Sequence, residues 1–236
     1  MQTVILAGGL GTRLRPLTNN IPKPMVLLNG KPYLEYQIEY LKQFGFTDIV
    51  LAVGYLGEQI ESYFGDGDKW GVSIQYSHET IPLGTAGGLK HAEKHISTNE
   101  FLFLNGDSFL PMQLTDFTHS FLKRGKSCLI AVYDNQENTH VKNNIKLDDD
   151  GDVCLYEKEG SNTLSHVDSG VLCLKKDILS YIKKGVNSSL ESDVFPQLIK
   201  NKHMAAYIVN TRFYDIGTPE RLTEAEIFFK NFQQTN

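Results

Sequence analysis

Short apolar runs alternate with segments of helical periodicity along most of this 236-residue chain. Residues 4–7 and 49–53 have the composition of buried strands, and between them residues 32–44 repeat apolar side chains at helical spacing. Strands separated by helices at this interval need crossover connections, which bring successive strands together in parallel. The pattern therefore predicts an α/β fold, a Rossmann-like, three-layer arrangement in which helices cover both faces of a mostly parallel sheet.

The remaining periodic segments extend this pattern to the end of the chain. Further strands are expected at 72–76, 101–104, 128–133 and 205–209, and further helices at 58–64, 86–95, 115–123, 177–184, 191–200 and from Pro219 onward. Residues 144–174 differ, because strand-like pieces follow one another around the turn signal Asp148-Asp149-Asp150-Gly151. Since no linker, repeat or low-complexity stretch is visible, we expect a single domain over residues 1–236 with a small antiparallel insertion.

The charge balance limits the partners of the chain. Acidic side chains number 28 and basic ones 23, which gives a net charge of −5. A nucleic-acid-binding protein relies on a broad basic surface, so this balance argues against a nucleic-acid partner. A local basic pocket remains compatible with it, because a phosphorylated small molecule needs only a few well-placed cations.

The cysteines and the hydropathy pattern predict where in the cell the protein is located. Cys128, Cys154 and Cys173 lie far apart without a CxxC pair, so we expect three reduced cysteines in the core of a cytosolic protein. The first apolar run stops at Gly8 and lacks the basic start and the length of a signal peptide. No apolar stretch approaches the ~18 residues that a membrane span needs. We therefore expect a soluble, cytoplasmic protein without a membrane partner.

A glycine-rich loop, Gly8-Gly9-Leu10-Gly11, directly follows the first predicted strand. Glycines at such a turn let backbone N–H groups approach phosphate oxygens without obstruction by a Cβ atom. The loop is not a nucleotide P-loop, because no Gly-Lys-Ser/Thr ends it. It is not the dinucleotide fingerprint either, since Thr12-Arg13-Leu14 stands where a third glycine would be needed.

Cations follow the glycines at short intervals. Arg13 and Arg15 lie in the loop, and Lys23 lies between two prolines that stiffen its approach. A bidentate Arg combined with the point charge of a Lys suits a polyphosphate whose charge shifts during a reaction. The alternative is a structural glycine turn with solvated cations. The joint occurrence of glycines, Thr12, arginines and Lys-Pro favours the phosphate-binding interpretation.

These residues resemble the signature of the sugar-1-phosphate nucleotidylyltransferase family, which is close to GGxGTRLxPLT followed by PKP. Further segments resemble motifs of this family in the same order along nearly the whole chain: Glu79–Gly88 its base-recognition segment, Leu104–Asp107 its metal-binding strand end, Tyr156–Lys158 and Asp168–Gly170 its sugar-phosphate pocket, and Tyr214–Pro219 its late segment with a second aspartate.

The resemblance implies that a sugar 1-phosphate attacks the α-phosphorus of a nucleoside triphosphate and releases pyrophosphate. The nucleophile is already an ionised phosphate, so positioning and charge neutralisation should supply most of the catalysis. The implied cofactor is Mg²⁺, which prefers one or two carboxylates together with water and substrate oxygens. Asp107 and Asp215 are its implied ligands. Taken alone, an Asp beyond a strand is more often a turn or helix cap.

The resemblance also implies roles for further residues. Arg13 would hold the β- and γ-phosphates, and Lys23 would bind near the α-phosphate as the second catalytic residue. The implied nucleotide-binding residues are Leu6, Gly8, Gly9, Gly11, Thr12, Glu79, Pro82, Gly84 and Thr85. The implied sugar-phosphate-binding residues are Asn105, Glu157, Lys158, Asp168 and Gly170, of which the pair at 157 and 158 could instead be a solvated pair on a strand.

The nucleotide and the sugar are less sharply defined. Gly84-Thr85-Ala86-Gly87-Gly88 looks most like the segments of family members that transfer guanylyl groups, which favours GTP, although some uridylyltransferases carry similar segments. Within the family the chain most resembles heptose-1-phosphate and then mannose-1-phosphate guanylyltransferases, with UTP-dependent transfer to an N-acetylmuramate- or glucose-type 1-phosphate as an alternative. In thymidylyl- and glucose-type members of the family, this region usually reads Tyr-Gly followed by valines, with the glycine close to the sugar. Here the corresponding stretch is Val141-Lys142-Asn143-Asn144-Ile145, so that contact does not carry over, and the sugar could instead bind through Asn143 or Asn144.

One competing interpretation belongs to another class, a non-catalytic regulatory subunit of the same fold. The presence of Arg13, Lys23 and Asp107 argues against it. The sequence predicts no oligomeric state, because helix faces that pair with a partner look like helix faces that contact the core.

Overall fold

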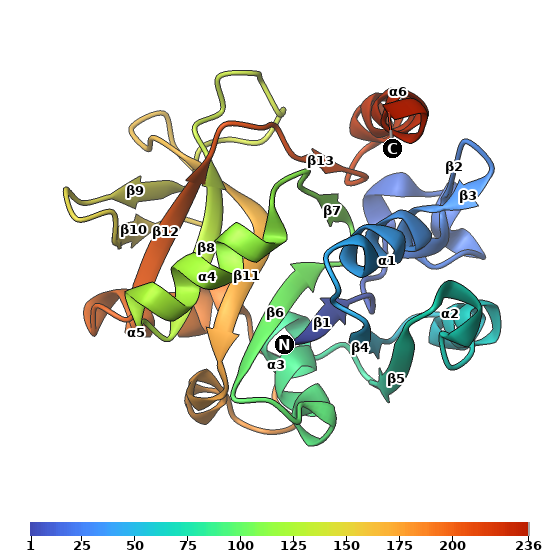
Figure 1. The fold of residues 1–236 in the computed structure, drawn as a ribbon, viewed down its shortest axis with the longest axis horizontal. Helices are drawn as coiled ribbons and strands as arrows, with labels where there is room; N and C mark the ends of the chain where they lie inside the picture. Colours follow the sequence, from blue (N-terminus) through green and yellow to red (C-terminus); the bar gives the residue numbers. More distant parts are fainter. Residues whose placement is uncertain (236) are drawn as a thin grey trace.

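A mixed sheet forms the centre of the computed structural model, which describes residues 1–235 and the side chains of residues 1–232. Within these residues seven strands pair in the order β12-β8-β11-β6-β1-β4-β5 (Figure 1). They are β1 (Gln2–Leu6), β4 (Asp48–Val53), β5 (Ser73–His78), β6 (Glu100–Asn105), β8 (Cys128–Tyr133), β11 (Val167–Lys175) and β12 (Met204–Val209). Only β11 runs antiparallel to its two neighbours, β6 and β8. The expected mostly parallel α/β sheet is confirmed.

Helices cover both faces of this sheet (Figure 1). The described helices are α1 (Tyr33–Gln43), α2 (Gly57–Phe64), α3 (Gly84–His91), α4 (Leu114–Arg124), α5 (Phe195–Lys200) and α6 (Pro219–Thr235). Successive residues of a strand point to opposite faces, so Ile5 packs in a core with α1, α2, α4 and α6, whereas Val4 packs in a second core with α3 and α5. The expected three layers are therefore present, and burial on both faces explains why β1, β4, β6 and β8 read as nearly continuous apolar runs.

The ends of β1 and β6 approach each other unusually closely. The N–H group of Gly106, the residue after β6, donates a hydrogen bond to Leu6 O at 2.8 Å. A Cβ atom at position 106 would lie 2.4 Å from the same oxygen, so only glycine fits there. This contact brings Asp107 next to the glycine loop that follows β1.

The expected antiparallel insertion is a hairpin outside the main sheet. Strands β9 (Ile145–Leu147) and β10 (Val153–Tyr156) pair antiparallel. In the turn between them, Asp148 Oδ1 accepts hydrogen bonds from the N–H groups of Asp150 at 3.1 Å and Asp152 at 2.9 Å. The hydroxyl of Tyr156 donates to Asp168 Oδ2 on β11 at 3.0 Å and so ties the hairpin to the sheet.

Three expectations differ from the structure in detail. The helix expected at 177–184 is a 3-10 helix, Lys176–Tyr181. It ends early because the chain becomes extended at Ile182. The helix expected at 191–200 begins with a π-helical turn, Leu190–Val194, and only then continues as α5; Pro196 has no N–H to donate to the preceding turn. Cys128 and Cys173 are buried free cysteines, but Cys154 is exposed, because one face of the hairpin is not covered.

Two further pairs of short strands lie outside the main sheet. Strands β2 (Leu27–Leu28) and β3 (Lys31–Pro32) form one antiparallel pair, and β7 (Ser108–Phe109) and β13 (Tyr214–Asp215) form the other. The second pair aligns Asp215 with Ser108, the neighbour of Asp107. Among the described residues, none of the helices combines the length and apolar character needed to cross a membrane.

Asp168 makes the stability of the docked hairpin depend on pH. Burial, together with the negative charge of Glu191, raises the pKa of Asp168 from 3.8 to about 6, although bonds from Gly170 N–H and the Tyr156 hydroxyl oppose the shift. The folded protein thus holds this proton more tightly than the unfolded chain does. The free energy of unfolding therefore falls as the pH rises from 3.8 to about 6.

We expect Asp168→Asn, which resembles the protonated carboxyl, to remove this loss of stability. The variant should gain up to about 3 kcal/mol over the wild type at neutral pH, and the two proteins should be nearly equal at a pH near the unfolded pKa of 3.8. Chemical denaturation at both pH values measures the difference. A difference in stability that does not change with pH would contradict the assignment.

Candidate active site

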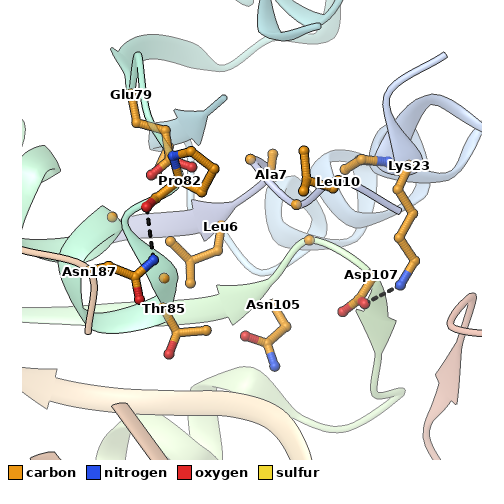
Figure 2. Close-up of a pocket in the computed structure, with 17 residues that line it drawn as sticks. Leu6, Ala7, Leu10, Lys23, Glu79, Pro82, Thr85, Asn105, Asp107 and Asn187 are labelled. Carbon is orange, nitrogen blue, oxygen red and sulfur yellow. Dashed lines mark hydrogen bonds and ion pairs between the residues drawn. The ribbon is translucent and has the colours of Figure 1, made fainter. Parts of the chain in front are cut away.

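A cavity of about 370 Å³ opens where β1, β4 and β6 end, at their carboxyl edge. Ligands of open α/β sheets characteristically bind at this edge. Ten of the residues predicted from the sequence line it: Leu6, Gly8, Gly9, Lys23, Glu79, Pro82, Gly84, Thr85, Asn105 and Asp107. Figure 2 shows Lys23 and Asp107 at one end of the cavity and Pro82, Thr85 and Asn187 at the other. The predicted phosphate side and base side are thus two ends of one space.

An ion pair between Lys23 and Asp107 occupies the first of these ends (Figure 2). The Lys23 side chain is only 10% exposed, whereas 34% of the Asp107 side chain is exposed. Burial opposes ionisation of Asp107, but the charge and hydrogen bond of Lys23 hold the pKa of that carboxyl below its ordinary value. The charge of Arg13 acts in the same direction. Asp107 is therefore an ionised carboxylate that remains accessible from the cavity.

Asp215 lies beside Asp107, although it is 108 residues away in the sequence and does not line the cavity. The two segments are joined by the pairing of β7 with β13 and by a hydrogen bond from Ile216 N to Asp107 O at 3.1 Å. Asp215 pairs with Arg221 of α6 at 3.0 Å. Burial raises the pKa of Asp215; Arg221 opposes this shift and the charge of Asp107 adds to it. Asp215 also caps its own turn, since Gly217 N donates to it at 2.6 Å.

The carboxylates of Asp107 and Asp215 form a donor set that suits Mg²⁺. This ion commonly takes one or two protein carboxylates and completes its octahedron with water and phosphate oxygens. No group of three or more His, Cys, Asp or Glu side chains with metal-binding geometry occurs among the described residues. The pair therefore fits a metal that is bound largely by its substrate, and does not form a closed metal cage.

The end of the cavity that was predicted to hold the base is built from glycines and a partly buried network of hydrogen bonds. Gly84, at the start of α3, has φ +74, and a Cβ atom there would lie 2.4 Å from Ser188 O. Thr85 donates from its hydroxyl to Glu191 Oε2 at 2.9 Å and accepts from Leu190 N at 2.8 Å. Asn187 donates to Pro82 O at 2.8 Å and so closes this end (Figure 2).

Glu79 is held against the glycine loop at the same side. Cβ atoms at Gly8 and Gly54 would each lie 2.8 Å from Glu79 Oε1, so the carboxylate fits only because both positions are glycine. Leu83 N donates to Glu79 Oε2 at 3.4 Å. Burial raises the pKa of Glu79, with the bond from Leu83 and the charge of His91 opposing the shift.

The remaining predicted residues lie around the cavity without lining it. Gly11 starts the 3-10 helix Thr12–Leu14, whose Thr12 and Arg13 are exposed. A Cβ atom at Gly170 would lie 2.9 Å from Asn105 Nδ2, so Gly170 packs directly behind that cavity residue.

Glu157 and Lys158 are exposed beyond the end of β10. The Lys158 ammonium donates to Ser189 Oγ at 3.4 Å and lies 3.9 Å from Glu191 Oε2. The structure therefore brings Lys158 and Thr85 to the same carboxylate, that of Glu191.

Asn143 and Asn144, the plausible sugar contacts, both have partners inside the protein. Asn143 donates to Leu164 O at 3.0 Å and accepts from Asn135 at 3.0 Å. Asn144 Oδ1 accepts from Asp168 N at 2.9 Å, and its amide nitrogen donates to the Tyr156 hydroxyl at 3.3 Å. Both amides thus support the walls of the hairpin region.

Several residues of the site were not named among the candidates from the sequence. Ala7, Leu10, Pro24, Ala52, Gly88, Gly106 and Asn187 also line the cavity. Glu191 contacts Thr85, which is 106 positions away, and Arg221 contacts Asp215, which is six positions away. Gly106 and Pro24 lie inside recognised motifs and could have been named with them. Asn187, Glu191 and Arg221 are ordinary polar residues, which only the fold brings to the site.

Comparisons with known proteins agree with this geometry. Residues 2–231 match the family described as Nucleotidyl transferase. The D-glycero-alpha-D-manno-heptose 1-phosphate guanylyltransferase of Campylobacter jejuni is 36% identical over 220 residues, which cover 93% of this chain and 96% of that protein. The UTP--glucose-1-phosphate uridylyltransferase of Synechocystis is 34% identical over 92% of this chain, and the match spans 60% of that relative's length.

A solved structure is similar over the whole fold. The crystal structure of HddC from Yersinia pseudotuberculosis complexed with GMP-PN has a TM-score of 0.82 and 31% sequence identity. The superposition covers 97% of this chain and 99% of that one. The family match over residues 2–231, together with these likenesses, shows that the chain belongs to the nucleotidyl transferase family.

Proposed function

We propose that this nucleotidyl transferase passes GMP from GTP to a sugar 1-phosphate, a heptose or hexose derivative, and releases pyrophosphate. The observation that carries the proposal is the single cavity with an ion pair of Lys23 and Asp107 at one end and a glycine-lined base side at the other. The guanylyltransferase from Campylobacter jejuni and the HddC structure with GMP-PN support the choice of nucleotide and of substrate class.

The reaction forms one P–O bond and breaks another. A phosphate oxygen of the sugar 1-phosphate attacks the α-phosphorus, and the bond from that phosphorus to the oxygen bridging the β-phosphate breaks, so pyrophosphate leaves with the electron pair. The attacking oxygen is already ionised, and no general base is needed. The protein has to align the two phosphates and stabilise the charge that develops between them.

Lys23 and Arg13 would supply positive charge from the protein. Lys23 is buried at the cavity wall, where it would donate to the α-phosphate, and Arg13 on the exposed 3-10 helix would hold the β- and γ-phosphates. The backbone N–H groups of Gly8, Gly9, Gly11 and Thr12 would face the same phosphates. Asp107 and Asp215 would hold Mg²⁺, which when bound neutralises phosphate oxygens and orients them.

The sugar 1-phosphate would bind on the β10–β11 side of the cavity. Lys158 would leave its weak contacts with Ser189 and Glu191 to bind the phosphate, since its side chain is 55% exposed and its ion pair is long at 3.9 Å. Asn105 would contact the sugar from the cavity wall. Glu157, Asp168 and Gly170 would complete the pocket for its hydroxyl groups.

Glu79 offers a physical basis for preferring guanine. Its carboxylate can only accept hydrogen bonds when ionised, and the Watson–Crick edge of guanine presents two adjacent donors, N1–H and the 2-amino group. Uracil presents one donor between two carbonyl oxygens, which a carboxylate repels. Leu6, Pro82, Gly84 and Thr85 would enclose the base.

A uridylyltransferase is the second candidate. The Synechocystis relative, which carries UTP in its name, is nearly as similar in sequence as the guanylyltransferase. Pyrophosphate release from GTP, UTP, ATP, CTP and dTTP, each paired with a panel of hexose and heptose 1-phosphates in Mg²⁺, tests both. We expect turnover with GTP. Turnover with UTP alone would refute the guanylyl assignment, and silence with all pairs would favour a regulatory protein of the same fold.

Removal of the buried ammonium should abolish most of the turnover. We expect Lys23→Met to lower kcat by about 100- to 1000-fold, because a donor aimed at developing charge in a water-poor site contributes that much. Lys31→Met serves as the control. Its ammonium lies 2.6 Å from the Glu39 carboxylate and does not line the cavity. Thermal unfolding of both variants separates loss of catalysis from loss of fold. Near-normal turnover of a folded Lys23→Met protein would refute the catalytic role of Lys23.

Substitution of the carboxylate on the base side should alter nucleotide preference. We expect Glu79→Gln to lower the ratio of kcat/KM for GTP to that for UTP by at least about tenfold, because one of the two acceptors becomes a donor. Glu58→Gln, an exposed change on α2, should leave the ratio unchanged. An unaltered ratio in Glu79→Gln would mean that guanine is recognised by other groups.

A further inference from the structure

Polar side chains on one face of helix α1 bond the backbone of other segments, and two of them reach the loops that carry the acidic pair. Tyr33, Gln37 and Tyr40 are spaced four and three residues apart, so they lie along the same side of the helix. Their exposed fractions are 0%, 1% and 8%. Each of these buried side chains uses its polar end to bond a main-chain group of another segment.

Gln37 spans the turn from which Asp107 projects. Its amide nitrogen donates to Asn105 O at 2.9 Å and to Ser108 O at 2.7 Å. These two carbonyl groups flank Gly106 and Asp107. Both partners are acceptors, so only the amide nitrogen of Gln37 can make the two bonds. The conformation of the Asp107 turn is thus held from inside the core.

The other end of the same amide shows that this arrangement is costly. Gln37 Oε1 is buried without a hydrogen-bond partner among the residues with described side chains. A buried acceptor without a partner opposes folding, and an apolar side chain at this position would not carry that cost. The two hydrogen bonds to the Asp107 turn offset this unfavourable contribution.

Tyr33 holds the second loop one helical turn earlier. Its hydroxyl donates to Tyr214 O at 3.3 Å, and Tyr214 directly precedes Asp215. The two loops are also joined to each other, through the pairing of Ser108 with Asp215 and the bond from Ile216 N to Asp107 O. One helix therefore bonds the backbone next to both members of the acidic pair.

We propose that Gln37 and Tyr33 are positioning residues that set the separation of Asp107 and Asp215 and thereby the affinity for the complex of Mg²⁺ with the nucleotide. Neither side chain lines the cavity, so both act through the main chain. The inference rests on the proposed function, because it takes the two carboxylates to be the metal ligands. Mutation of a partner that orients a metal ligand typically costs about 10- to 100-fold in metal affinity or activity.

The test uses variants that remove hydrogen bonds with little change of shape. Gln37→Met removes both donors, and Tyr33→Phe removes one hydroxyl. Tyr36→Phe and Tyr40→Phe are matched controls on the same helix, because their hydroxyls donate to Leu28 O at 2.9 Å and to Met112 O, away from both aspartates. If Gln37→Met fails to fold, Tyr33→Phe carries the same test with a smaller change.

Hydrogen–deuterium exchange reports the positioning itself, without nucleotide. We expect faster exchange of the Gly106 amide, which donates to Leu6 O, and of the Ile216 amide, which donates to Asp107 O, in Gln37→Met and Tyr33→Phe. Exchange at both amides should stay at the wild-type rate in the two controls. Equal exchange in Gln37→Met and Tyr40→Phe would overturn the positioning role.

Calorimetric binding of GTP, measured once with Mg²⁺ and once with EDTA, reports the metal. We expect the ratio of the two affinities to fall by roughly 10- to 100-fold in Gln37→Met, with the affinity in EDTA unchanged. The ratio should be unchanged in Tyr36→Phe and Tyr40→Phe. A ratio equal to that of the wild type in Gln37→Met would overturn the inference. If Mg²⁺ had no effect on the binding of any nucleoside triphosphate to the wild-type protein, the proposed function would be refuted, and with it the positioning role of Gln37 and Tyr33.

Discussion

The close approach of β6 to β1 is the constraint on which the site depends. A hydrogen bond from Gly106 N to Leu6 O joins the ends of the two strands, and the absence of a Cβ atom at position 106 makes the contact possible. Parallel pairing of β1 with β6 and β4 then places three strand ends at one edge. The glycine loop and the Asp107 turn, which follow β1 and β6, therefore lie next to each other at this edge.

Charges at this edge are balanced in pairs. Asp107 is neutralised by Lys23 and Asp215 by Arg221, so two partly buried carboxylates lie on adjoining loops without an uncompensated charge. The carboxylates differ in character, because the pKa of Asp107 is held below its ordinary value and that of Asp215 is raised. Packing behind them is equally specific, with helix α1 bonding the two loops from the core.

Local patterns predicted much of the fold. Apolar runs of four to six residues marked the buried strands, and the family that the glycine-and-cation loop and the later motifs resemble implied ten of the residues that line the cavity. Long-range placement could not be predicted in the same way. Glu191 and Arg221 look like surface charges in the sequence, and Gln37 looks like a polar break in an apolar helix face. Their partners are 106, 6 and 68 residues away, and for Glu191 and Gln37 only the tertiary fold brings them into contact.

The ion pair of Lys23 and Asp107 has a consequence for how charged ligands enter the cavity. The buried Lys23 ammonium has the Asp107 carboxylate as its counterion, so the folded protein does not contain an unpaired, desolvated cation at this position. In the proposed reaction the Asp107 carboxylate would exchange its ammonium partner for a divalent cation, and the Lys23 ammonium would exchange its carboxylate partner for a phosphate. Binding is then a swap of counterions between partners of matching sign. Ligand binding would therefore require little further desolvation of Lys23, because its ammonium is already buried in the folded protein.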